Sequence, residues 1–280
     1  MDQALHQPGP YARTRRLVFG TAKVFLDPDT SLRCAGTAFF GFLSLFPAIG
    51  IAVFAYGLVA DIETFMATIE TLRYLVPAAV LDVLREQLAI LVTQPPATLS
   101  IGLAVSIVLA LWSGSRGVSA LIYAMSRVRR EPERRNFVHS LFISVILTIG
   151  GAIFLAVALV TIAGLPALIP FPSGEELVVL ALRWPVLLLL TIAVLSMLYR
   201  WGPDRHPRKF RHIWPGAVLA SLLWLAAGAL FSIYVENFSN YQASFGSVTA
   251  AVVLLLWLYN SAQIFVLGAA FNAQLEYSAN

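Results

Sequence analysis

The sequence predicts an all-α integral membrane protein with six transmembrane helices. Hydrophobic residues make up 59% of the 280 and charged residues only 12%, whereas a soluble domain carries about 25% charged residues. A chain this apolar cannot cover its surface with polar groups, so lipid is the expected solvent for much of it. The other two observations behind the prediction are six long apolar runs and the uneven placement of the basic residues.

Six apolar runs are long enough to cross a bilayer. A helix rises about 1.5 Å per residue, so roughly 20 apolar residues cross about 30 Å of hydrocarbon, and a helix satisfies its own backbone hydrogen bonds there. In the fourth run Arg183 and Pro185 interrupt the start, which leaves five spans as the alternative. Pro47 in the first run and Pro185 are expected to kink or interrupt their helices. The predicted spans are 34–60, 97–124, 137–165, 177–199, 213–234 and 245–273, within one membrane domain covering 1–280.

The basic residues orient these spans. Fifteen Lys and Arg residues fall before the first span, between the second and third, and between the fourth and fifth. Only Arg73, Arg85 and Arg183 fall on the other side, and Arg116 lies within a span. The excess of basic residues marks the cytoplasmic side, so both termini are predicted to be cytoplasmic. The N-terminal 33 residues lack the short apolar run and cleavage site of a secretory signal, so the first span is expected to be retained.

Two segments outside the spans are predicted to be helical. Residues 10–30 form a cytoplasmic amphipathic segment, in which 11–26 would lie in the headgroup layer with its arginines on anionic lipid. A solvated basic leader is the alternative. Residues 61–96 read as two short amphipathic helices on the outer surface, broken at Pro77 and ended by Pro95 and Pro96. They are expected to pack on the bundle or to lie on the membrane, and use as a gate is the alternative.

The most informative residue is Arg116, flanked by Ser113 and Ser115. It lies 11 residues before Arg127, or about 16 Å along a helix. A charge at that depth costs at least ~2.5 kcal/mol, so Arg116 is expected to face the bundle interior or a wet cavity. One interpretation is a group that binds a phosphate, a carboxylate or a lipid headgroup. The other is an arginine that caps the carbonyls of a broken helix or reaches back to the interface.

The sixth span carries two amides, Asn260 and Gln263, on one helix face. Hydrogen bonds between helices are one explanation, and a polar pathway is the other. The six runs contain no Asp or Glu, which disfavours a proton relay built on intramembrane carboxylates. Small residues that allow close helix approach follow the second span and the end of the sixth. They are Ser106, Ala110, Ser113, Gly117, Ala120 and Ala124, and then Gly268, Ala269 and Ala273.

Nothing in the sequence predicts an enzyme, a cofactor or a metal site. The four histidines, His6, His139, His206 and His212, show no spacing typical of metal ligands. A phosphate-binding glycine loop and a nucleophile elbow are also missing. The single cysteine, Cys34, allows no intramolecular disulfide. The basic loops do not require a nucleic-acid partner, because the positive-inside rule already accounts for them. Membrane lipids are the expected partners, and the sequence leaves the oligomeric state open.

Three stretches resemble the YihY/BrkB family of bacterial inner-membrane proteins. They are the run Phe39 to Pro47 (FFGFLSLFP), the run Leu111 to Gly117 (LWSGSRG), and the closing stretch from Tyr234 to Asn272. The likeness covers about residues 10–276 and implies a six-span protein of the bacterial inner membrane. Family members have been labelled virulence or serum-resistance factors and ribonuclease BN, and the residues here argue against the nuclease label. Transport has also been suggested for the family, including lipid handling.

This chain departs from the family pattern in the sixth span. Family members tend to carry a glutamate where Ala270 stands and often a second acid at Gln274, and an apolar residue is usual at Asn260. We therefore expect a transporter of an anionic or amphipathic molecule, with a phospholipid-like substrate as the first candidate. Arg116, Ser113, Ser115, Asn260 and Gln263 would bind it. A small-solute carrier or channel, and a non-transporting scaffold for envelope assembly, are the alternatives.

Overall fold

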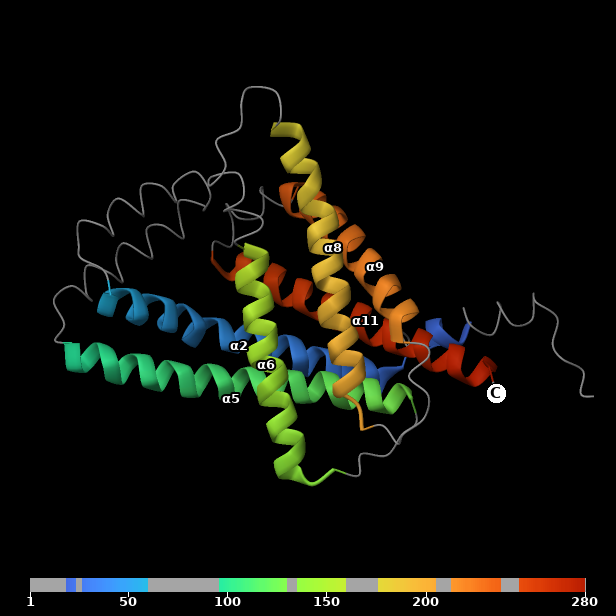
Figure 1. The fold of residues 1–280 in the computed structure, drawn as a ribbon, viewed down its shortest axis with the longest axis horizontal. Coiled ribbons are helices and arrows are strands. Elements are labelled where there is room, and N and C mark those ends of the chain that lie inside the picture. Colours follow the sequence, from blue (N-terminus) through green and yellow to red (C-terminus); the bar gives the residue numbers. More distant parts are fainter. Residues whose placement is uncertain are drawn as a thin grey trace, which may run out of the picture. The chain divides into compact units, whose positions relative to one another are not determined.

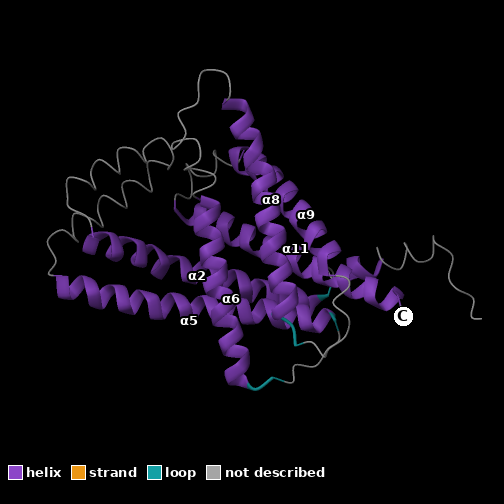
Figure 2. Ribbon diagram, in the orientation of Figure 1, coloured by secondary structure: helices purple, strands orange, loops and turns teal. Residues whose placement is uncertain are grey.

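The computed structural model describes residues 19–23, 27–59, 96–129, 135–159, 176–204, 213–237 and 247–279. Within these ranges the chain is helix joined by short turns and bends, with no strand (Figure 2). The all-α prediction is confirmed for this part of the chain. The predicted helices in 61–96 lie outside the described residues, except for Pro96, which begins a helix.

Six helices in the described part are long and apolar enough to cross a membrane (Figure 1). This confirms the six predicted spans. They bury little of their apolar surface within the protein, as expected for helices whose outer faces contact lipid tails. The helices are α2 (Pro28–Val59), α5 (Pro96–Val128), α6 (Phe137–Leu159), α8 (Glu176–Trp201), α9 (Ile213–Asn237) and α11 (Ser247–Ala279).

The first helix begins six residues before the predicted span, because Asp27 caps it. The Asp27 carboxylate accepts hydrogen bonds from the Thr30 backbone N–H at 3.0 Å and from the Thr30 hydroxyl at 2.7 Å. The hydroxyl bond lowers the pKa of Asp27 below its ordinary value. Pro28 occupies the first helical position, where its missing N–H costs nothing. The sixth helix likewise runs past 273 to Ala279, and the predicted end of the third span, 160–165, lies outside the described residues.

The prolines do not interrupt their helices. Helix α2 continues through Pro47 and α8 continues through Pro185. Of the predicted kink or interruption, the interruption does not occur at either position, and the kink stays a prediction. Within a membrane the rest of the helix is held by backbone bonds that have no competing water, so a helix tolerates the loss of a single bond.

The structure divides into two compact units, and each is described by itself. Unit 1 comprises residues 1–39 and 115–280, and unit 2 comprises 40–114. In unit 2, α2 and α5 are antiparallel neighbours. Gly102 faces the ring of Phe54, Gly50 faces Ser106, and the rings of Phe40 and Trp112 meet edge to face with centroids 6.3 Å apart. The prediction of one membrane domain stays a prediction.

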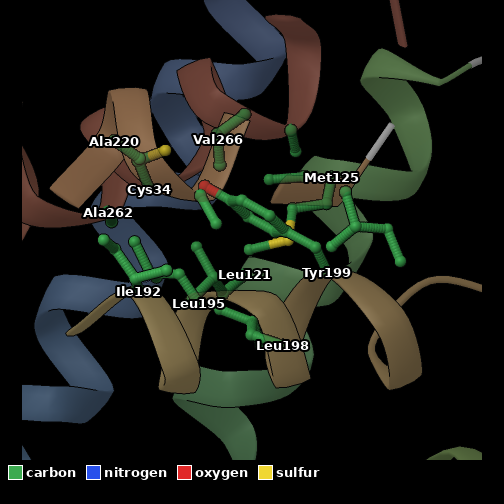
Figure 3. Packing of buried hydrophobic residues seen from close by; sticks show 14 residues of the cluster. Cys34, Leu121, Met125, Ile192, Leu195, Leu198, Tyr199, Ala220, Ala262 and Val266 are labelled. Carbon is green, nitrogen blue, oxygen red and sulfur yellow. The ribbon is translucent and has the colours of Figure 1, made fainter. Parts of the chain in front are cut away.

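In unit 1, helix α9 packs between two partners. It contacts α11 and α8, and α8 also contacts α6 (Figure 1). A buried core joins segments of α2, α5, α8, α9 and α11 (Figure 3). Figure 3 shows the ring of Tyr199 beside Met125, with its hydroxyl oxygen directed toward the side on which Val266 and Cys34 lie. The other buried members of this core are Leu121, Ala124, Ile192, Leu195, Leu198, Ile213, Ala217, Ala220, Ala262 and Ala269.

Of the predicted interfacial helix 11–26, the structure describes only 19–23, which is helical. Thr21 is buried there, and a Cβ added to Gly20 would lie 2.7 Å from Cδ of Gln274 on α11. This turn therefore contacts the end of α11. Ala22 and Lys23 are exposed. The predicted position in the headgroup layer stays a prediction.

Candidate functional site

Arg116 lies on an exposed face of α5. Among the described residues the structure gives it no ion pair. The adjacent residue Ser115 is buried, with 2% of its surface exposed. Successive residues of a helix are separated by about 100°, so Ser115 points toward the packed side of α5 while Arg116 points away from it. The predicted placement of Arg116 toward the bundle interior or a wet cavity stays a prediction.

Ser113 is buried and already has a hydrogen-bond acceptor. Its hydroxyl donates to the carbonyl oxygen of Leu109 at 2.7 Å, one turn earlier in the same helix. This back-bonding is common for serine in membrane helices, because it satisfies the hydroxyl without a second helix. Ser113 belongs to unit 2, whereas the other four predicted site residues belong to unit 1. A ligand at Ser113 would have to compete with that intrahelical bond.

On α11, Gln263 is a buried amide with one polar atom unsatisfied. Its side chain is 6% exposed, and its Nε2 donates to the hydroxyl oxygen of Tyr259. Its Oε1 is buried and has no hydrogen-bond partner. A buried acceptor without a hydrogen-bond partner costs about 1–3 kcal/mol. A hydrogen-bond donor on a ligand would therefore bind favourably at the Gln263 Oε1. Asn260, one turn earlier, is half-buried.

Arg116 and Gln263 lie equally far along their helices from one ion pair. The ends of α5 and α11 are joined by an ion pair between Arg129 and Glu276. Arg116 precedes Arg129 by 13 residues, and Gln263 precedes Glu276 by 13 residues. Each therefore lies about 20 Å along its helix from that ion pair. Arg116 is exposed and Gln263 is buried, so they do not form one closed cluster.

The ends of α2, α5 and α11 that meet at this ion pair are cross-linked by polar contacts. Arg129 is buried, and its Nη2 contacts Oε2 of Glu276. The hydroxyl of Tyr277 donates to the Arg129 carbonyl oxygen at 2.8 Å. The Nη2 of Arg127 lies 3.0 Å from Oδ2 of Asp29, in an exposed pair. We call this end of unit 1 the tied end; it includes Asp29, Arg127, Arg129, Glu276 and Tyr277.

A third basic residue of the tied end, Arg135, binds the C-terminus of α8. Arg135, just before α6, donates to the carbonyl oxygens of Gly202 at 2.9 Å and of Pro203 at 3.0 Å. Its Nε lies 3.2 Å from Oδ1 of Asp204. The last carbonyls of a helix have no intrahelical partner, and a guanidinium offers them several donors in one plane. Arg135 thus joins the start of α6 to the end of α8.

Asn272 holds the start of α9 from the neighbouring helix. It is fully buried, its Oδ1 accepts from the Gly216 N–H at 2.7 Å, and its Nδ2 donates to the Ile213 carbonyl oxygen at 3.0 Å. Close to it, the Tyr199 hydroxyl donates to the Phe265 carbonyl oxygen at 2.7 Å. The first four N–H groups of a helix lack intrahelical acceptors. Asn272 therefore supplies an acceptor for one of these N–H groups, in place of a capping residue next to the helix in the sequence.

The sequence does not predict these contacts. Arg129 is one of the fifteen basic residues that mark the cytoplasmic side, and Glu276 lies just beyond the sixth predicted span. An amide inside a predicted span, Asn272, is the signal that could have been used. Among the described residues, no group of three or more His, Cys, Asp or Glu is placed to hold a metal ion.

Comparisons with known proteins identify relatives along most of the chain. A family model described as "Virulence factor BrkB" matches residues 21–280. A Bacillus subtilis (strain 168) protein named ribonuclease-like, YfkH, is 34% identical over 183 residues, which is 62% of this chain and 66% of that protein. A UPF0761 membrane protein of Idiomarina loihiensis is 29% identical over 163 residues, covering 57% of this chain and 56% of that protein.

A UPF0761 membrane protein of Tolumonas auensis is 34% identical over 93 residues, or 33% of this chain and 30% of that protein. The matches thus span less than two thirds of the length of these curated relatives. No solved structure matches the chain.

Proposed function

The chain belongs to the BrkB family, a family of multi-pass membrane proteins, and on that premise we propose that it binds and translocates an anionic or amphipathic molecule. A phospholipid-like molecule is the first candidate. The observation that carries the proposal is the exposure of Arg116 on a membrane-spanning helix. The proposed action is binding and movement, without a chemical reaction.

An exposed arginine at this depth needs a compensating group. Among the described residues no acid pairs with Arg116, and placing its charge at the centre of a span costs at least ~2.5 kcal/mol. A phosphate or carboxylate offers two oxygens to the planar guanidinium, which makes an arginine a better ligand for it than a lysine. Reaching back to the interface is the competing explanation, and the two differ in whether an anion stabilises the protein.

The amides of α11 do not form one cluster with Arg116 in this structure, so they would supply the uncharged part of the binding surface only after Gln263 becomes accessible. The Gln263 Oε1 has no hydrogen-bond partner, so it can accept from a hydroxyl or ammonium group. Asn260 is half-buried one turn away. A phospholipid headgroup commonly carries both an anionic phosphate and such donors, whereas a simple inorganic anion carries no ammonium donor. This combination is why the phospholipid-like molecule comes first among the substrate classes.

We propose that the tied end faces the cytoplasm of a bacterial inner-membrane protein whose two termini are cytoplasmic. It carries Arg127, Arg129, Arg135 and Arg200, and basic residues accumulate on the cytoplasmic side. A reporter active only in the cytoplasm should work when fused after Asn280 or inserted near Glu133 or Arg208. A reporter active only outside should work near Glu70, and cytoplasmic activity at Glu70 would overturn the orientation.

The test of the anion site compares wild type with Arg116→Ala and Arg116→Lys. We expect anionic phospholipid at 100 times its Kd to stabilise the wild type by about 2.7 kcal/mol, because a ligand that binds only the folded state stabilises it. Arg116→Ala should lose most of this gain, and Arg116→Lys should keep part of it if a point charge suffices. The measurement is the melting temperature in detergent with increasing anionic lipid, with a zwitterionic lipid as control.

Three results would contradict the proposal. Equal stabilisation of wild type and Arg116→Ala would remove Arg116 as the anion ligand and leave the basic loops as the lipid contact. Stabilisation by a soluble organic phosphate but not by lipid would favour the small-solute carrier. A protein stabilised by neither would favour the scaffold for envelope assembly. Arg116→Ala should insert and express normally in each case, since it removes a charge that is costly in the membrane.

A further inference from the structure

The ion pairs between helices gather at one end of unit 1. In the part of the chain that the structure describes, the three pairs are Arg127 with Asp29, Arg129 with Glu276, and Arg135 with Asp204. Each joins the end of one helix to the end of another or to the turn that follows it. Such ties hold helix ends together without restraining the remainder of each helix, and this is the arrangement that a closed end of a transport path requires.

The pair of Arg129 and Glu276 differs from its neighbour in burial. The side chain of Arg129 is 4% exposed and that of Glu276 is 28% exposed, whereas Arg127 and Asp29 are 60% and 57% exposed. Exposed pairs contribute little, because water and salt screen them. Removing an acid that contacts a buried arginine is costly, because the buried charge loses part of its compensation. Of these two pairs, the Arg129–Glu276 pair therefore restrains the tied end more strongly.

The single cysteine of the chain lies directly inside this end. Cys34 is fully buried in the core of unit 1, to which Leu121 and Met125 also belong (Figure 3). It is five residues into the helix from Asp29, or about 8 Å below the helix ends. Because residues of α5 and α11 belong to the core that buries Cys34, we expect a reagent to reach its thiol when the ends of α2, α5 and α11 separate. Cys34 is thus a native reporter of the state of the tied end.

We propose that the tied end is the closed cytoplasmic gate of the transport path and that the Arg129–Glu276 ion pair is its latch. This inference rests on the proposed function, because a gate presupposes passage. Opening breaks the pair, lets water reach both charges and exposes the core around Cys34. The Tyr277 hydroxyl, which donates to the Arg129 carbonyl oxygen, holds the latch arginine at the end of its helix.

The test measures the rate at which N-ethylmaleimide labels Cys34 in the purified full-length protein, by mass spectrometry and without substrate. We expect slow labelling of the wild type. Glu276→Gln should be labelled at least about tenfold faster, because it removes an acid that compensates a buried charge. The double charge swap Arg129→Glu with Glu276→Arg should return the rate to within about threefold of wild type, since it restores an ion pair at the same place.

Two control variants separate opening of the latch from general loosening. Arg127→Gln removes the exposed pair at the same end and should leave the labelling rate within about threefold of wild type. Phe231→Ala removes a ring that stacks on Trp257 with centroids 5.0 Å apart, far along α9 from the tied end. It should lower the melting temperature without the same acceleration. Equal acceleration by Phe231→Ala at equal loss of stability would overturn the latch.

A wild-type labelling rate in folded Glu276→Gln would also overturn it. If Glu276→Gln does not fold, Tyr277→Phe decides, because it removes only one hydrogen bond from the latch. We then expect acceleration of about threefold, and no acceleration contradicts the proposal. The latch and the anion site are tested by independent measurements, so either proposal can be contradicted without the other. Cys34 reports on the tied end in the absence of any lipid, whereas the Arg116 variants report on stabilisation by lipid.

Discussion

Gly216→Ala is expected to destabilise the protein by about 3 kcal/mol, at the upper end of the range for overpacking. A Cβ at this position would collide with the backbone oxygen of Gly268 and lie 2.5 Å from Cγ of Asn272. The reciprocal change, Gly268→Ala, would place a Cβ 2.6 Å from the Gly216 oxygen and 2.7 Å from Cβ of Ala220. Because backbone atoms are involved, α9 and α11 must move apart. The measurement is the free energy of unfolding in detergent.

The matched control is Gly150→Ala on α6. A Cβ at Gly150 meets no atom within 4 Å, so no packing cost opposes the change. Alanine in a helix interior is favoured over glycine by roughly 0.5–1 kcal/mol, and the control should be neutral or stabilising. The same substitution should therefore lower the free energy of unfolding at Gly216 and leave it unchanged or raise it at Gly150. A small effect at Gly216 would show that α9 and α11 are less closely packed than the structure indicates.

Asn272→Leu is expected to cost about 2 kcal/mol, because it leaves the buried Gly216 N–H without its side-chain acceptor and removes a second bond to the Ile213 carbonyl oxygen. The N–H of Gly216 and the carbonyl of Ile213 both bond the Asn272 side chain. Leucine has a similar volume but neither donor nor acceptor. Thermal and denaturant unfolding in detergent should both show the loss, and the start of α9 should exchange its amide hydrogens faster.

The control for this change lies on the same helix. Asn260 is half-buried, and Asn260→Leu should change the free energy of unfolding by less than about 1 kcal/mol. An equal cost for the two leucine variants would mean that Asn272 does not act as a cap for α9. Together, the glycine and asparagine variants test whether α9 and α11 form a fixed pair. The latch proposal requires such a pair, because α11 carries Glu276 while the ends of α2 and α5 separate from it.

The sequence was sufficient for the number and approximate extent of the spans. An apolar run of 20 or more residues has one stable form in hydrocarbon, and that form does not depend on neighbouring chain segments. Each predicted span therefore coincides with one helix in the described part of the chain. The ends were less accurate, because Asp27 and Thr30 start α2 outside the hydrocarbon layer. Both helices continue through Pro47 and Pro185, where a kink or an interruption was expected, because helix continuity also depends on backbone bonds further along the chain.

The candidate site was predictable only in part. The sequence singled out Arg116 and Gln263 because charged and amide groups are costly in hydrocarbon wherever they face. It could not show that one is exposed and the other buried, because the side that a residue presents depends on which helices pack against it. The sequence also could not show whether the serine hydroxyls are available to a ligand. Ser113 is a polar residue in a span, but its hydroxyl donates to the carbonyl of Leu109 in its own helix.

The sequence by itself determined the membrane class, the six helices and the family, because these depend on properties of short segments read one at a time. Only the tertiary structure decided that Arg129 pairs with Glu276, that Asn272 holds the start of α9, and that Gly216 meets Gly268. These contacts join residues 52 to 147 positions apart in the chain. Their partners become neighbours only after the helices have packed, so no local pattern of residues encodes the pairing.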